Sequence, residues 1–66
     1  MQIIVNNQAV NVANNSTIID LINQLELDAQ RIAIEHNRVI LAPDQFDSLT
    51  LCADDNIEIV NFVGGG

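Results

Sequence analysis

The sequence predicts a small α+β domain in which a mixed sheet of about five strands packs one face against a single helix. Apolar residues alternate with a period of two at both ends of the chain, which is typical of half-buried strands. One segment between them has apolar residues at helical spacing instead. With 66 residues, 48% of them apolar, the chain can build one core, so we expect a single domain over residues 1–66.

The first two strands are expected to form a hairpin. Ile3 and Val5 alternate with Gln2, Ile4 and Asn6, and Val10 and Val12 resume the same alternation beyond a polar break at 7–8. Two short strands of this kind, separated by turn-forming residues, are typical of a β-hairpin.

The helix is predicted to begin after Thr17. Asp20 follows three positions later, which is the spacing of a capping box, and its carboxylate is favoured in the first turn of a helix. The apolar side chains that follow lie at i, i+3, i+4 and i+7 and form one stripe: Ile18, Leu21, Ile22 and Leu25. Ile19 lies at the edge of this stripe.

The second half of the chain returns to strand periodicity. From Arg31 the period returns to two and predicts a third strand, a turn at 37–38 leads to a short fourth strand at 39–41, and Pro43 ends it. The last and longest strand is predicted at 57–63 and runs directly into the glycines. The helix stripe and one sheet face then form the core.

The charge and the N-terminal sequence limit the partners. Nine acidic residues against two arginines give a net charge of -7, which excludes nucleic acid because binding a polyanion requires cations. A basic protein surface suits this charge better, although net charge also keeps a small domain in solution. No apolar run is long enough to cross a membrane and no targeting segment is visible, so we expect a cytoplasmic protein.

The residue types needed for catalysis are sparse. Cys52 stands between apolar neighbours, so we interpret it as a small buried hydrophobe rather than a reactive thiol. His36 has the parity of buried strand residues and is interpreted as partly buried rather than as a base. With one Cys and one His there is no metal-ligand set, and no glycine-rich loop precedes a helix to hold phosphate. We therefore predict no catalytic residue and no metal site.

The three terminal glycines, Gly64, Gly65 and Gly66, are the most informative feature. Without Cβ atoms they can pass where any side chain would clash. Because an extended residue spans about 3.3 to 3.6 Å, three of them carry the terminal carboxylate roughly 10 Å beyond the last packed residue. We interpret them as a flexible tail that enters a narrow site on another protein. The alternative is a frayed end or an added remnant.

The chain resembles the ubiquitin-like β-grasp fold and is similar to the ThiS family, the sulfur carrier proteins of thiazole (thiamine) biosynthesis. The residues that carry the resemblance are the ending 58–66, the strand 33–35, Pro43 and the acidic turn at 54–55. The chain departs from the family at Asn37-Arg38, where Asn-Gly is common, and at Phe46, where Trp is common. Both positions concern loops and packing.

The resemblance implies a carrier and not an enzyme. In this family the terminal carboxylate, here that of Gly66, is adenylated by an E1-like enzyme and converted to a thiocarboxylate, which donates sulfur to thiazole synthase. ATP and Mg would be bound by the adenylating partner, so no cofactor is expected on this chain. The sulfur would come from a cysteine desulfurase or a rhodanese-like donor.

A docking face can be predicted from the last strand. Glu58 is expected to face water, which places Val60 and Phe62 on the same outer face. Ile57 and Ile59 then face the helix. Apolar side chains rimmed by carboxylates next to the tail suit partner docking, so Glu58, Val60 and Phe62 are the predicted docking residues. The alternative is an ordinary surface with scattered hydrophobes.

Three other functions remain open from the sequence. The small subunit of molybdopterin synthase has the same fold and ending, although its members are usually longer. A ubiquitin-like modifier would also end in Gly-Gly and would form isopeptide bonds. An interaction domain whose tail has no function is the third.

Overall fold

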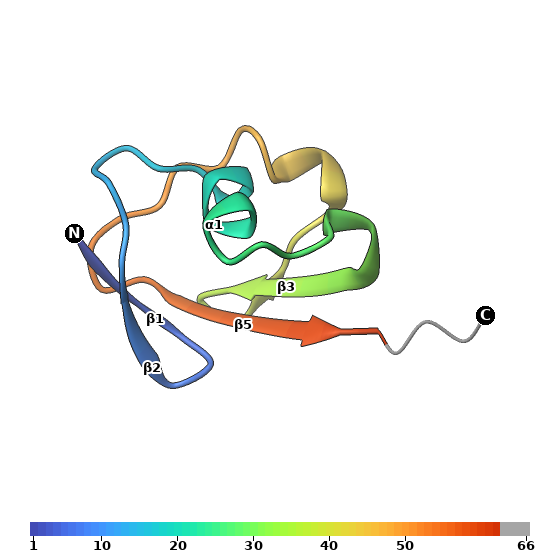
Figure 1. Ribbon diagram of the computed structural model, residues 1–66, viewed down its shortest axis with the longest axis horizontal. Helices are drawn as coiled ribbons and strands as arrows, with labels where there is room; N and C mark the ends of the chain where they lie inside the picture. Colours follow the sequence, from blue (N-terminus) through green and yellow to red (C-terminus); the bar gives the residue numbers. More distant parts are fainter. Residues whose placement is uncertain (63–66) are drawn as a thin grey trace.

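The computed structural model describes residues 1–62. They form a five-stranded sheet with strand order β2-β1-β5-β3-β4 and one α-helix lying across one face (Figure 1). The β1–β5 pairing is parallel and the other pairings are antiparallel, so the sheet is mixed and the predicted α+β fold class is confirmed. In chain order the elements are β1 (Gln2–Val5), β2 (Gln8–Asn11), α1 (Ile18–Gln24), η1 (Ala29–Arg31), β3 (Ile32–His36), β4 (Val39–Ile40), η2 (Pro43–Gln45) and β5 (Asn56–Asn61), where η marks a short 3-10 helix.

Two tight turns with left-handed backbone close the hairpins. Asn6 and Asn7, with φ of 48° and 67°, join β1 to β2, one residue earlier than the predicted break. Asn37 and Arg38, with φ of 50° and 73°, join β3 to β4. Positive φ at both central residues is the signature of the type I′ turn, which matches the twist of paired strands. Asn tolerates this conformation, whereas Arg38 occupies a position where Gly would have no steric cost.

The predicted capping box is present at the start of α1. The Thr17 amide donates to Asp20 Oδ2 at 2.9 Å, and the Asp20 amide donates to Thr17 Oγ1 at 3.3 Å. These two bonds satisfy amides that have no partner within the helix. Ile18, Leu21 and Ile22 are buried as predicted, while Leu25 is half-buried at the end of the helix and Ile19 packs at the edge of the core.

The core lies between α1 and one face of the sheet. The long connection from β4 to β5 closes it from the side and passes around the helix (Figure 1). Phe46 and Leu51 bring buried side chains from this connection, and backbone bonds hold it to the helix region, from the Ile19 amide to the Phe46 carbonyl at 2.8 Å and from the Leu51 amide to the Ser16 carbonyl at 2.7 Å. The buried apolar residues are Ile3, Val5, Val12, Ile18, Leu21, Ile22, Ile32, Ile34, Leu41, Phe46, Leu51 and Ile57.

The last strand is shorter than predicted. The sequence predicts strand over 57–63, whereas β5 ends at Asn61 and Phe62 follows as its last described neighbour. Val63 lies outside the described residues. Within residues 1–62, no helix has both the length and the apolar character that crossing a membrane requires.

Candidate functional site

The strand β5 connects the core to the end of the chain. Ile57 is fully buried and pairs with Val5 of β1 on one side and with His36 of β3 on the other. The pairing with β1 ends there. The side-chain amide of Asn6 then continues the ladder, because the Ile59 amide donates to Asn6 Oδ1 at 2.8 Å and Asn6 Nδ2 donates to the Ile59 carbonyl at 3.2 Å. The start of β5 is therefore held on both edges.

Within residues 1–62, the other end of β5 is held on one edge, by β3 and by Arg31 directly before it. Asn61 pairs with Ile32, and the Phe62 amide donates to the Arg31 carbonyl at 2.7 Å. This bond anchors the last described residue to the sheet. The predicted tail residues Gly64, Gly65 and the sulfur-carrying Gly66 lie outside the described residues.

Exposure along β5 follows the predicted alternation. Ile57 is 0% exposed and Ile59 is half-buried, whereas Glu58 is exposed and Val60 is 59% exposed. The face opposite the helix, here called the outer face, therefore includes Glu58 and Val60. Their partners in β3 and β4 lie on the same face: Ala33 beside Val60, Glu35 beside Glu58, and Ile40 beside Glu35.

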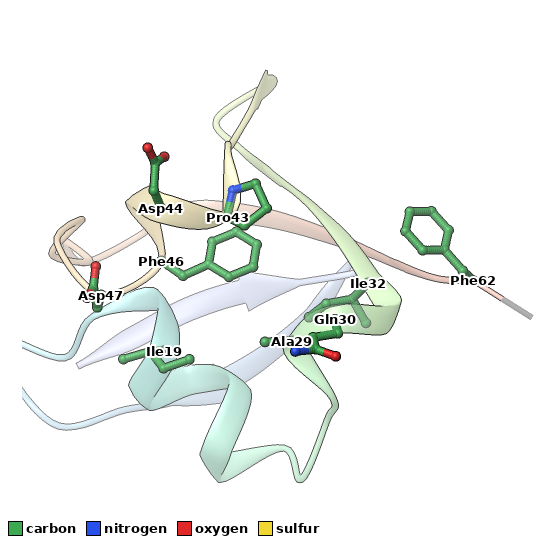
Figure 2. A pocket seen from close by; sticks show the side chains of 9 residues that line it. All are labelled: Ile19, Ala29, Gln30, Ile32, Pro43, Asp44, Phe46, Asp47 and Phe62. Carbon is green, nitrogen blue, oxygen red and sulfur yellow. The ribbon is translucent and has the colours of Figure 1, made fainter. Parts of the chain in front are cut away.

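Phe62 is 55% exposed, as expected, but its surroundings differ from those of Val60. It lines a pocket of about 650 Å³ together with residues of the helix side (Figure 2). The alternation of side chains between the two faces of the sheet stops before Phe62, because β5 ends one residue earlier. Phe62 thus borders the helix side at the base of the tail, and this pocket was not predicted. The other lining residues are Ile19, Ala29, Gln30, Ile32, Pro43, Asp44, Phe46 and Asp47.

A hydrogen-bond network fixes the turn that precedes β5. Asp55 is 8% exposed and accepts bonds from the Cys52 amide at 2.8 Å and from Asn37 Nδ2 at 3.2 Å, while His36 Nε2 lies 2.8 Å from its Oδ2. The Asn56 amide donates to Asn37 Oδ1 at 2.8 Å. The network joins the β3–β4 turn to the start of β5.

The same network determines the ionisation of Asp55. Burial by itself raises the pKa of this carboxyl, but the hydrogen bonds from the Cys52 amide, His36 and Asn37 outweigh burial, and the pKa lies below its ordinary value. Hydrogen bonds to a carboxylate favour the charged form. His36 is half-buried, which confirms its predicted environment, while its partnership with Asp55 was not predicted. The acidic turn at 54–55 was the only available signal.

The interpretation of Cys52 as buried is wrong, because the residue is exposed. Its apolar neighbours suggested burial, but only one of them is in the core. Leu51 is 2% exposed, and Ala53 is exposed like Cys52. The chain turns immediately after Leu51 to reach Asp55, so the direction of the backbone and not the local composition determines where the thiol points.

Within the described part of the chain, no three His, Cys, Asp or Glu side chains gather in a way that could hold a metal ion. The ionisable network at Asp55 stabilises a turn and lies at the start of β5, whereas the tail leaves from the other end. The exposed end of β5 and the glycines that follow it in the sequence are therefore the candidate functional site.

Comparison with known proteins agrees with this geometry. The ThiS family model matches residues 2–66. The sulfur carrier protein ThiS of Bacillus subtilis is 38% identical over 53 residues, which cover 80% of each chain. The crystal structure of the thiamine biosynthesis protein ThiS from Geobacter metallireducens superposes with a TM-score of 0.85 at 29% identity and covers all of both chains.

A further similarity concerns a larger protein. Thiazole synthase of Paramagnetospirillum magneticum is 29% identical over all 66 residues of this chain, a match that covers 20% of that protein. A helix-covered mixed sheet whose last strand leads to a glycine end is the arrangement of a small β-grasp domain. The chain belongs to the ThiS family, the sulfur carrier proteins of thiamine biosynthesis, and is a carrier rather than an enzyme.

Proposed function

We propose that the carboxylate of Gly66 carries the sulfur atom. A carboxylate is a poor electrophile, so an E1-like enzyme first joins it to AMP from ATP and releases pyrophosphate. The terminal sulfur of a persulfide on the donor protein then attacks the carbonyl carbon and AMP leaves, which gives an acyl disulfide. A cysteine thiol of the donor or of the adenylating enzyme reduces this S–S bond, so that a protein disulfide forms and the thiocarboxylate of Gly66 is released. This thiocarboxylate donates its sulfur to the thiazole ring of thiamine.

The observation that carries this proposal is the continuity from the core to the end of the chain. The ThiS family match extends through residue 66, and β5 leads from the fully buried Ile57 to the exposed Phe62. Three glycines follow Val63 and carry no side chain that would obstruct entry into an enzyme.

The chemistry requires several partners. The adenylating enzyme binds ATP and Mg, and the sulfur comes from a cysteine desulfurase or a rhodanese-like protein. Thiazole synthase is the acceptor, which is supported by a relative in which a segment similar to this chain is part of a thiazole synthase. We propose that the carrier acts in the cytoplasm.

Glu58, Val60 and Phe62 are proposed to dock these partners. All three are exposed next to the residues that lead into the tail. An enzyme that holds the tail in its active site must also contact the surface around the base of the tail. Exposed apolar side chains beside a carboxylate are suited to such contact.

The experiment is intact-mass measurement after incubation with an adenylating enzyme, ATP and a sulfur source. Deleting Gly66 should abolish the mass increase for exchange of oxygen by sulfur, while the melting temperature hardly changes because a terminal glycine has no side chain to pack. The Cys52→Ala variant is the matched control. It should still gain sulfur, since the thiol is not the carrier.

Two outcomes would contradict the proposal. Normal sulfur loading of the chain that lacks Gly66 would exclude the terminal carboxylate as the carrier group. Formation of isopeptide conjugates with other proteins, without a thiocarboxylate, would favour a ubiquitin-like modifier. The comparisons favour the thiazole carrier over the small subunit of molybdopterin synthase.

A further inference from the structure

The outer face places two carboxylates directly opposite each other. Glu35 of β3 and Glu58 of β5 are register partners in the antiparallel pair. Two pairs of the same parity, one on each side, are joined by a backbone bond, from the Asn37 amide to the Asn56 carbonyl and from the Phe62 amide to the Arg31 carbonyl. Glu35 and Glu58 therefore also occupy a position of the ladder where the two backbones are hydrogen-bonded, with Cα atoms about 5.5 Å apart.

Such a pair is unfavourable in the isolated domain. Like charges placed directly opposite in a sheet repel each other, and both side chains are exposed. Within residues 1–62, neither carboxylate has a cationic nitrogen within 4.0 Å. Arg31 is one of the two basic side chains of the chain, and it faces Asp28 at 3.6 Å. The described structure leaves the pair without a counter-charge.

Apolar side chains flank the two carboxylates. Val60, beside Ala33, is 59% exposed, and Ile40, beside Glu35, is 73% exposed. These are two of the large hydrophobic residues that the domain leaves exposed. A partner that docks on this surface would bury the apolar side chains. The same contact would also remove the two carboxylates from water. Burial of two unpaired charges is costly, so the partner must supply a cation at this point.

We infer that the outer face docks on thiazole synthase through an arginine of the synthase whose guanidinium bridges Glu35 and Glu58. This inference rests on the proposed function, from which the synthase is taken as the sulfur acceptor. The relative that contains a similar segment within a thiazole synthase supports this partner. The charge of -7 on the chain also favours a basic surface on the partner.

The geometry favours a guanidinium over an ammonium group. A guanidinium is planar, always charged and presents five donors in a fixed fork, so it can bond to two carboxylates at once. It is also less strongly hydrated than an ammonium group and packs against apolar side chains. Val60 and Ile40 offer such packing on the same face as the two carboxylates.

The test uses two isosteric double variants of the full chain. Glu35→Gln with Glu58→Gln removes the pair. Glu26→Gln with Asp54→Asn removes the same charge from exposed positions outside the outer face. Binding of each to purified thiazole synthase is measured over a range of NaCl concentrations, and the melting temperature of each free variant is measured in parallel.

The variant with Glu35→Gln and Glu58→Gln, here called the paired variant, should bind about tenfold more weakly or worse, because it loses two charge-assisted bonds. Its affinity should also depend less on salt. Its melting temperature should equal or exceed that of the natural chain, since repulsion is relieved. The control should bind like the natural chain. Equal binding by the two double variants, or no binding of the natural chain to the synthase, would overturn the docking inference.

A second measurement identifies the cation. Phenylglyoxal modifies arginine, so the natural chain should protect one arginine of the synthase from this reagent, and the paired variant should not. Protection of a lysine alone against an acetylating reagent would overturn the assignment to arginine.

Sulfur loading, measured on the same samples, separates this inference from the proposed function. If the natural chain forms a thiocarboxylate but removal of the two carboxylates has no effect on binding, only the docking inference fails. If the natural chain cannot be loaded, the proposed function fails whatever the binding result.

Discussion

The two ends of β5 differ in the support they receive. At its start, Ile57 is fully buried between neighbouring strands, and the network around Asp55 fixes the turn before it. At its end, Val60 and Phe62 are more than half exposed, and within residues 1–62 the backbone is held on one edge, by β3 and Arg31. One strand thus combines an anchored end with an end available to partners.

This difference follows from where the sheet ends on each side. β1 stops at Val5, so its pairing with β5 ends at Ile57, and the Asn6 side chain extends the support only to Ile59. β3 continues to pair as far as Asn61. A carrier can therefore present its last residues to an enzyme while its core stays folded. Substitutions at the two ends should accordingly affect different properties.

The largest effect is expected from Ile57→Asp at the anchored end. An unpaired charge at a fully buried position should destabilise the domain by more than about 4 kcal/mol, which approaches the whole stability of a small protein. Circular dichroism should show an unfolded chain. A cooperative melt near that of the natural chain would contradict the assignment of Ile57 to the core. Because Ile59 is half-buried, a charge there should be less destabilising than the sequence predicts.

A smaller effect, on binding, is expected from Phe62→Asp at the exposed end. Because Phe62 is 55% exposed, its loss should change the free energy of unfolding by less than about 0.5 kcal/mol. Complex formation with the adenylating enzyme should weaken by about 2 kcal/mol or more, roughly thirtyfold, since an aromatic anchor is replaced by a charge. Calorimetric titration measures this, and an unchanged Kd would remove Phe62 from the docking residues.

Asp55→Asn tests the network that anchors β5. At neutral pH it should cost about 1 to 3 kcal/mol, because bonds to the charged carboxylate are lost or weakened. The lowered pKa of Asp55 means that its ionised form stabilises the fold above the ordinary Asp pKa of about 3.9 and that this contribution disappears as the pH falls through the folded-state pKa. The difference in melting temperature between the two proteins should therefore shrink below about pH 4. A constant difference down to pH 2 would argue against this role.

The smallest effect is expected from Cys52→Ala. The thiol is exposed, so the free energy of unfolding should change by less than about 0.5 kcal/mol. Chemical denaturation measures this change. A loss well above 1 kcal/mol would instead support the buried interpretation that the structure contradicts.

Much of the fold could be predicted because local patterns and tertiary packing agree. The alternation in β1, β2, β3 and β5, the helix stripe and the Thr17–Asp20 capping box all occur as expected. Each depends on neighbours within a few residues, where periodicity and hydrogen-bond reach determine the outcome. The exposure of Glu58 and Val60 also followed, because the side chains of a strand alternate by geometry.

The sequence by itself determined the fold class, the helix boundaries within a residue or two, the alternation along β5 and the side-chain-free glycine end. Only the tertiary structure decided that Cys52 is exposed, that Asp55 is held by His36 and Asn37, that Phe62 borders a pocket on the helix side, and that Glu35 meets Glu58. The reason is physical. These features join residues up to 43 positions apart, as Ile19 and Phe62 are in the pocket, and their meeting depends on strand register and on the path of a long connection, which no local pattern specifies.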